Sequence, residues 1–87
     1  MRIKIIEEDF NKAGRYTSPS ECLLATALQR VYGNRASMGV FDFSVNGQTY
    51  NIPYSQMKKI YKAYDLERSQ PLKIVDKTPF TVYAEKA

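Results

Sequence analysis

The side chains of this chain that could do covalent chemistry are few, and Cys22 is the first of them. It is the only cysteine, and the sequence contains no histidine. A nucleophilic cysteine needs a base within hydrogen-bonding reach, and Ser-His-Asp triads and most zinc sites are built with histidine. The glycine patterns of phosphate-binding loops are also missing. We therefore predict no catalytic residue, no metal site and no cofactor, and we interpret Cys22 as a small buried apolar residue.

A second group of polar residues surrounds the start of a predicted helix and could bind an anion. Residues 18–21 read Ser-Pro-Ser-Glu, which matches a capping box with Ser18 at the N-cap. The free N–H groups of a helix start, together with Arg15, Ser18 and Ser20, are groups that hold phosphate. They form a candidate site for a small nucleotide or another anionic ligand. A capping box would use some of the same donors, so simple capping is the competing interpretation.

A cluster of lysines lies on the polar face of a second predicted helix, over residues 54–64. The apolar residues of this helix recur with the i, i+3, i+4, i+7 spacing of a core-facing helix: Met57, Ile60, Tyr61 and Tyr64. The opposite face carries Lys58, Lys59 and Lys62. These ammonium groups could contact the phosphates of a nucleic acid, whereas the competing interpretation is a solvated helix face.

Tyrosine is frequent, with seven tyrosines among 87 residues. Exposed tyrosine suits a protein interface, because one rigid side chain supplies both contact area and a hydrogen bond. Four tyrosines are not assigned to a predicted core face, and they are candidates for contact with a partner: Tyr16, Tyr32, Tyr54 and Tyr83. The competing interpretation is that these tyrosines surround the rim of a small core.

The elements that must position these residues begin with a strand over residues 2–6, where polar and apolar residues alternate. A short helical segment at 7–14 follows it. The next helix should start at Ser18, end at Gly33 and turn Leu24, Leu28 and Val31 toward the core. The alternating run 80–84 predicts a final strand.

A β-hairpin should lie between the two main helices. Asn46-Gly47 is the residue pair that a type I′ turn prefers, because both central residues need positive φ. A two-residue turn sets the register and places the apolar side chains on one face, with two cross-strand pairs among them: Phe43 opposite Tyr50, and Phe41 opposite Ile52. The turn and the alternation therefore agree.

The order of these elements, β-α-α-β-β-α-β, predicts an α+β fold. We expect a single small domain over residues 1–87, with a core of modest size. It should contain a mostly antiparallel sheet of about four strands, with the two main helices packed on one face.

Charge and hydropathy limit the class of partner and the compartment. The net charge is +4 and the pI is about 9.3, which suits an acidic partner. The basic residues are not massed into blocks, so nucleic acid is not required. No apolar run approaches the roughly 20 residues of a membrane span, and the start does not read as a signal peptide. We therefore expect a cytoplasmic protein with no membrane partner.

The helix that contains Cys22 also resembles a pattern in small uncharacterised phage and prophage proteins. In these proteins, a Cys-x-Leu-Ala-x-Ala-Leu helix precedes a β-hairpin, a second helix and a closing Pro-Phe strand. The matching residues are Cys22, Leu24, Ala25, Ala27, Leu28, Pro79 and Phe80. The resemblance implies a phage setting in the cytoplasm of a bacterial host cell. Phage proteins of this size often bind and block host machinery, including defence nucleases and their signals.

Three functional hypotheses remain. We favour a small non-enzymatic binding protein, a phage-encoded inhibitor of a host defence protein. The first alternative is a nucleic-acid-binding protein that uses the lysine face. The second is a protein that sequesters a small nucleotide or another anionic ligand. Salt separates the first two, because phosphate-dominated binding weakens steeply as salt rises, whereas a tyrosine-rich protein interface is less sensitive.

Overall fold

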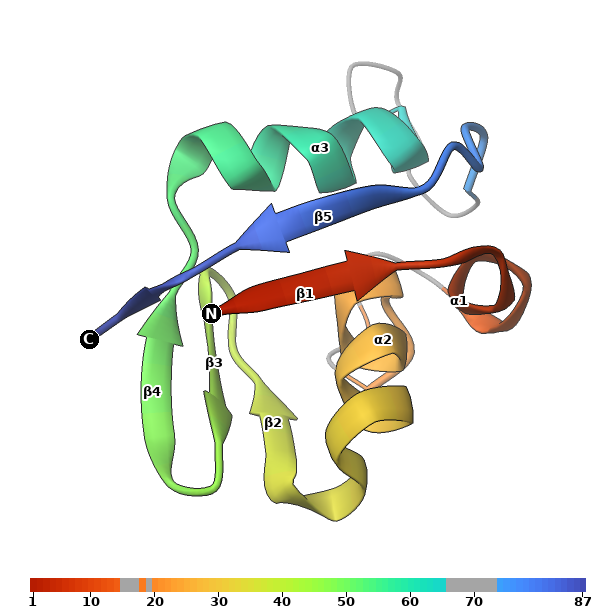
Figure 1. Cartoon of the computed structure of the whole chain (residues 1–87). Coiled ribbons are helices and arrows are strands. Elements are labelled where there is room, and N and C mark those ends of the chain that lie inside the picture. The colour runs from red at the N-terminus through yellow and green to blue at the C-terminus, as the bar shows by residue number, and fades with distance from the viewer. Residues whose placement is uncertain (15–17, 19, 66–73) are drawn as a thin grey trace.

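Helices and strands follow one another along the described chain in the predicted order, with two additional short strands (Figure 1). The computed structural model describes residues 1–14, 18, 20–65 and 74–87. Its helices are α1 (Glu7–Lys12), α2 (Leu23–Tyr32) and α3 (Tyr54–Tyr64). Its strands are β1 (Arg2–Ile5), β2 (Ala36–Met38), β3 (Asp42–Val45), β4 (Gln48–Asn51), β5 (Phe80–Tyr83) and β6 (Glu85–Lys86), and a 3₁₀ turn at Gly33–Arg35 joins α2 to β2. The protein therefore has the predicted α+β fold.

Every strand pair in the described chain is antiparallel, but the strands form two sheets rather than one. A four-stranded sheet has the order β2-β3-β4-β6, and β1 pairs with β5 in a separate two-stranded ribbon. The chain crosses from the ribbon to the larger sheet at Ala84, whose N–H donates to the Met1 carbonyl at 2.8 Å. The final strand, expected as part of one sheet, thus divides its pairing between β1 and β4.

The hairpin forms as predicted. Asn46 and Gly47 have φ values of 53° and 82°, which are the positive values that a type I′ turn requires. Phe43 lies opposite Tyr50, and the two rings stack with centroids 5.5 Å apart. Phe43 and Val45 are buried. The local turn chemistry and the alternation were sufficient to specify this register.

The prediction that Phe41 faces the core is wrong. Its side chain is 57% exposed, although its carbonyl accepts the Ile52 N–H at 2.9 Å as the register requires. The reason is the additional strand β2, which pairs with β3 and leaves Val40 and Phe41 in the connection between the two strands. Strand alternation no longer decides the direction of a side chain in such a turn.

Helix α2 begins later than the predicted capping box. The Cys22 N–H instead donates to the Ser18 carbonyl at 3.0 Å, and the helix starts at Leu23. The end is as predicted, because Gly33 caps the helix with a φ of 60°. The prediction that Val31 faces the core is wrong: it is 47% exposed in the last turn, just before the 3₁₀ turn.

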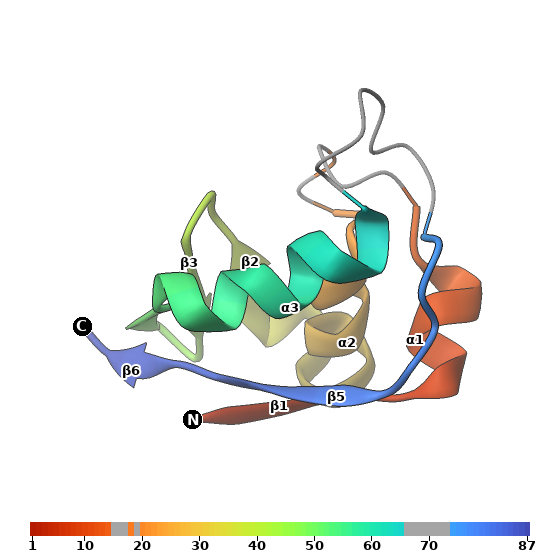
Figure 2. The same cartoon turned by 90° about the horizontal axis from the view of Figure 1, so that it is seen from above.

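The core lies between the helices and the two sheets. Helices α2 and α3 lie on the same side of the β1–β5 ribbon (Figure 2). Strands β1, β3 and β5 and helices α2 and α3 contribute fully buried side chains to one cluster, including Ile3, Ile5, Leu24, Leu28, Phe43, Met57, Ile60, Tyr64 and Val82. The predicted apolar face of α3 is confirmed for Met57, Ile60 and Tyr64, and Tyr61 is half-buried.

Tyr64 joins the end of α3 to the start of α2. Its hydroxyl accepts the Leu23 N–H at 2.8 Å and donates to the Gly14 carbonyl at 2.9 Å. The side chain is 1% exposed, and this burial raises the pKa of Tyr64 to about 12. Three segments that are distant in sequence therefore meet at one phenol group.

Candidate functional site

The candidate lysines and two of the candidate tyrosines meet on the outer surface of α3 and beside β5. Successive residues of a helix are rotated by about 100°, so the face opposite the buried Met57 and Ile60 carries Tyr54, Lys58 and Lys62. All three of these side chains are exposed. Helix α3 runs alongside β5 (Figure 1), and Tyr83 of β5 contacts Lys59 at one edge of this face. We call Tyr54, Lys58, Lys59, Lys62 and Tyr83 the tyrosine–lysine surface.

Tyr54 is the most exposed aromatic side chain of this surface. Its side chain is 67% exposed, at the first position of α3. The Lys58 ammonium lies 5.1 Å from the centre of its ring, and the ring of Tyr61 meets it edge-on at 6.3 Å. Cation–π and edge-to-face contacts of this kind are attractive. The ring is therefore open to solvent and held in place at the same time.

Tyr83 has a matching environment on the other edge of α3. It is 49% exposed, and the Lys59 ammonium lies 5.1 Å from the centre of its ring. Lys59 also donates to the Thr81 carbonyl at 2.8 Å, and the Tyr83 N–H donates to the Gln56 side chain at 3.1 Å. Two exposed tyrosines, one on each side of the helix, thus each make a cation–π contact with a lysine.

The prediction that Lys59 points into water is wrong. Its side chain is half-buried, and its ammonium is held by the Thr81 carbonyl and the Tyr83 ring. The physical reason is its position on the edge of α3 that faces β5, where a long lysine side chain can cover apolar surface and still find an acceptor. Lys58 and Lys62 are exposed, as predicted.

Of the two remaining candidate tyrosines, the structure describes Tyr32, which does not belong to this surface. Tyr32 is half-buried against the core, and its hydroxyl donates to the Met1 sulfur at 3.8 Å. Tyr32 therefore lies at the rim of the core, as the competing interpretation of the tyrosines expects. Tyr16 lies outside the described residues, so its role stays a prediction.

The candidate anion site is described only in part. Ser18 and Ser20 lie before α2, with their hydroxyl oxygens 3.5 Å apart, and Arg15 lies outside the described residues. Two of the N–H groups that an anion would use at the start of α2 are already paired, because Leu23 donates to Tyr64 and Ala25 donates to the Cys22 sulfur. An anion there would compete with both contacts.

Cys22 is buried, as predicted, and it is also the N-cap of α2. Its side chain is 6% exposed, and its sulfur accepts the Ala25 N–H at 3.4 Å. Burial raises the pKa of the Cys22 thiol above its ordinary value, which suppresses the reactive thiolate. Cys22 is therefore a structural residue with weak nucleophilicity.

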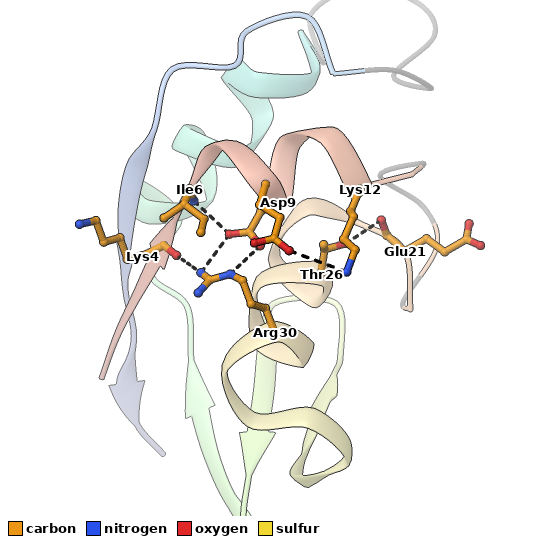
Figure 3. Close-up of polar contacts among 8 residues, drawn as sticks. Lys4, Ile6, Asp9, Lys12, Glu21, Thr26 and Arg30 are labelled. Carbon is orange, nitrogen blue, oxygen red and sulfur yellow. Dashed lines mark hydrogen bonds and ion pairs between the residues drawn. The ribbon is translucent and has the colours of Figure 1, made fainter.

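The most buried polar group among the described residues, which no sequence pattern indicated, is a carboxylate paired with an arginine (Figure 3). Asp9 is 0% exposed, and its carboxylate accepts hydrogen bonds from Arg30 Nε at 2.9 Å and from Arg30 Nη2 at 3.0 Å. It also accepts the Ile6 N–H at 3.0 Å, and Arg30 donates to the Lys4 carbonyl at 2.8 Å. The hydrogen bonds that Arg30 donates to Asp9 raise the pKa of Arg30 above its ordinary value. These contacts join β1, α1 and α2, and no local sequence pattern relates residues 21 positions apart.

A polar cavity of about 360 Å³ lies beside this ion pair, lined by residues that include Lys12, Glu21, Gln29 and Arg30. Its charges are of both signs, and the Arg30 guanidinium is already engaged with Asp9.

Among the described residues, no group of three or more His, Cys, Asp or Glu side chains could hold a metal ion. None of the helices in the described part of the chain is long and apolar enough to cross a membrane. The tyrosine–lysine surface brings five candidate residues together and is the strongest functional candidate.

Comparison with known proteins provides no further guide. No protein-family model, no curated protein and no solved structure matches this chain.

Proposed function

We propose that this chain is a non-enzymatic binding protein that docks onto a host protein through the tyrosine–lysine surface. One observation carries the proposal: Tyr54 and Tyr83 are 67% and 49% exposed, yet Lys58 and Lys59 each lie 5.1 Å from one of their rings. Tyrosine is enriched among the residues that dominate binding energy at protein interfaces. A ring that is already ordered loses less conformational entropy when it binds. The surface therefore has the properties of a prepared interface.

The charge of this surface indicates the chemistry of the partner. Helix α3 contains Lys58, Lys59 and Lys62 but no aspartate or glutamate between Tyr54 and Tyr64. A complementary protein would present carboxylates to Lys58 and Lys62 and apolar recesses to the two tyrosines. Such electrostatic complementarity speeds association and selects against basic partners.

A phage-encoded inhibitor of a host defence protein is the form of this function that we propose. The phage setting is supported by the resemblance alone, which rests on Cys22 to Leu28, on Pro79-Phe80 and on the order of the elements between them. An inhibitor that acts by binding blocks the surface that its target uses, so tight and specific docking is sufficient.

The proposal is tested by capture from a bacterial lysate with the immobilised wild-type protein, followed by purification of the captured protein and measurement of its Kd. The variants Tyr54→Ala and Tyr83→Ala should each weaken binding by about 2 kcal/mol, the size of a typical interface hot spot. Val31→Ala is the matched control, because Val31 is apolar and 47% exposed but lies in the last turn of α2, outside α3 and β5. Binding that is unchanged in both tyrosine variants would refute the proposal.

Nucleic acid is the second candidate partner, and one observation favours it. Arg2 and Lys4 lie opposite Tyr83 and Thr81 in the β1–β5 ribbon, and both basic side chains are exposed. They extend the basic surface beyond α3 and place an aromatic ring within it, which suits a single strand. The test measures fluorescence anisotropy of a labelled single-stranded oligonucleotide over a range of salt concentrations. If nucleic acid is the partner, replacing Lys58 and Lys62 with glutamate should reduce the salt slope by about one unit per lost phosphate contact.

A further inference from the structure

Strand β2 is an edge strand of the four-stranded sheet, and one side of its backbone is open. The order β2-β3-β4-β6 leaves β2 with β3 as its neighbour. The Gly39 N–H donates to the Asp42 carbonyl at 2.8 Å, and hydrogen-bonded pairs alternate along an antiparallel ladder. Ser37 is therefore the β2 residue that exchanges hydrogen bonds with β3. The backbone groups of Ala36 and Met38 point away from the sheet.

Three of these outward groups have no partner among the described residues. The Ala36 N–H is occupied, because it donates to the Gly33 carbonyl. The Ala36 carbonyl, the Met38 N–H and the Met38 carbonyl remain open. An edge strand with open donors and acceptors is a template for another strand. An extended polypeptide could donate two of its backbone N–H groups to the two open carbonyls and accept the open N–H with one of its own carbonyls.

A cavity of about 290 Å³ lies along this edge. Its lining includes Ala36 and Met38 of β2 on one side and Ala25, Leu28 and Gln29 of α2 on the other. Figure 1 shows that β2 is the strand of the sheet nearest to α2. The cavity thus combines a hydrogen-bonding edge with an apolar wall, which are the two parts of a site that binds peptides by strand addition.

We propose that β2 and α2 form a groove for an extended polypeptide segment of a partner protein. The segment adds to the sheet beside β2, bonds to the three open backbone groups, and places an apolar side chain in the cavity. None of the groove residues belongs to α3 or β5, so this inference does not depend on the tyrosine–lysine surface.

A second copy of the chain satisfies this edge less well. Symmetric antiparallel pairing of two β2 strands about Ser37 would set Met38 of each copy opposite Ala36 of the other. Each Met38 N–H could then reach an Ala36 carbonyl, but the Ala36 N–H that each Met38 carbonyl needs already donates to Gly33. Two buried carbonyls would lack a donor, which is unfavourable. A separate peptide can bond to all three open groups, and its one carbonyl opposite the occupied Ala36 N–H can lie at the end of the segment, in contact with water.

The test selects binders from a displayed library of random eight-residue peptides on the full-length protein and measures the affinity of a selected peptide. Met38→Pro removes the open N–H, and proline is tolerated at an edge position whose N–H faces outward. Gln29→Trp fills the groove from the exposed side of α2 without touching the backbone of β2. Val31→Trp is the matched control, because Val31 lies on the same helix, is 47% exposed and does not line the cavity.

We expect Met38→Pro and Gln29→Trp each to weaken binding of the selected peptide at least about tenfold, the effect of one lost backbone bond or an occluded groove. Val31→Trp should bind like wild type. Methylation of one backbone nitrogen of the peptide should also abolish binding, which a contact made by side chains alone would not show. Circular dichroism shows whether each variant is folded, and Gln29→Trp decides the result if Met38→Pro is not.

Three outcomes overturn the proposal. One is a selection that yields no peptide, and another is a peptide that binds Gln29→Trp and wild type equally. The third is a concentration-dependent dimer in analytical ultracentrifugation that Met38→Pro abolishes, because β2 would then be occupied by a second copy.

Discussion

Replacement of Arg30 by methionine tests the principal polar contact of the interior. Asp9 is 0% exposed and accepts two hydrogen bonds from Arg30 and one from the Ile6 backbone N–H. Methionine preserves much of the apolar length of the arginine side chain but removes the guanidinium. The buried carboxylate would then retain only the Ile6 N–H, and the Lys4 carbonyl would also lose a donor.

The expected loss of stability is large for a domain of this size. Removing one partner of a buried ion pair typically costs 3–5 kcal/mol, because a charge stays buried without compensation. The Arg30 side chain is 29% exposed, so water can partly replace it, and we expect a value of about 3 kcal/mol. The total stability of an 87-residue domain is about 4–13 kcal/mol. The variant should therefore lose a large fraction of it, with a decrease in Tm of about 12–24 °C.

Urea unfolding followed by circular dichroism measures this loss, with the slope of the transition as the check on two-state behaviour. Arg35→Met is the matched control, because Arg35 is exposed and its side chain donates, among the described residues, only to the Tyr32 carbonyl. Its effect should stay within about 0.5 kcal/mol. If Arg30→Met lost less than about 1 kcal/mol, the Asp9 charge would not be buried and paired as described.

Substitutions at three further positions test the capping cysteine, the hairpin turn and the buried tyrosine by the same assay. Cys22→Ser should be less destabilising than Cys22→Val. Serine is a strong N-cap, whereas valine loses the capping contact, which is worth about 1 kcal/mol. Rapid labelling of the wild-type thiol by a thiol reagent would contradict the burial of Cys22. Gly47→Val should cost about 2 kcal/mol through backbone strain alone, since φ is 82° and nothing lies within 4 Å of an added Cβ. A neutral effect would place the turn elsewhere. Tyr64→Phe should cost about 2 kcal/mol at neutral pH, because the buried Leu23 N–H loses its acceptor. The folded-state pKa of Tyr64 is raised from 10.0 to about 12, so the stabilisation from Tyr64 is complete below pH 10 and is lost as the pH rises toward 12. The stability difference between wild type and Tyr64→Phe should shrink across that interval, and a constant difference would refute the buried phenol.

The correct predictions from sequence concern features that a few neighbouring residues decide. Asn46 and Gly47 tolerate the positive φ of the turn, so the hairpin register followed from the dipeptide and its flanking alternation. Gly33 ended α2 for the same local reason. The apolar spacing of α3 likewise specified which of its faces is buried.

The wrong or missing predictions concern contacts between segments that are distant in sequence. The start of α2 was placed too early because Ser18 and Glu21 match a capping box, yet the Leu23 N–H finds its acceptor in Tyr64, 41 residues away. Lys59 was expected in water, but β5 supplies the Thr81 carbonyl and a ring that hold it. The sequence therefore indicated the individual residues of the tyrosine–lysine surface, but not that each exposed tyrosine contacts a lysine.

The sequence by itself determined the α+β class, the hairpin and the buried faces of the helices, because backbone preferences and side-chain periodicity act over a few residues. Only the tertiary structure decided how the strands divide between two sheets, because the strand at 80–86 can pair with more than one neighbour and its crossing at Ala84 depends on Met1. The same holds for Asp9 and Arg30. A buried charge is stable only when its partner is present, and the packing of α1 against α2 brings that partner into place.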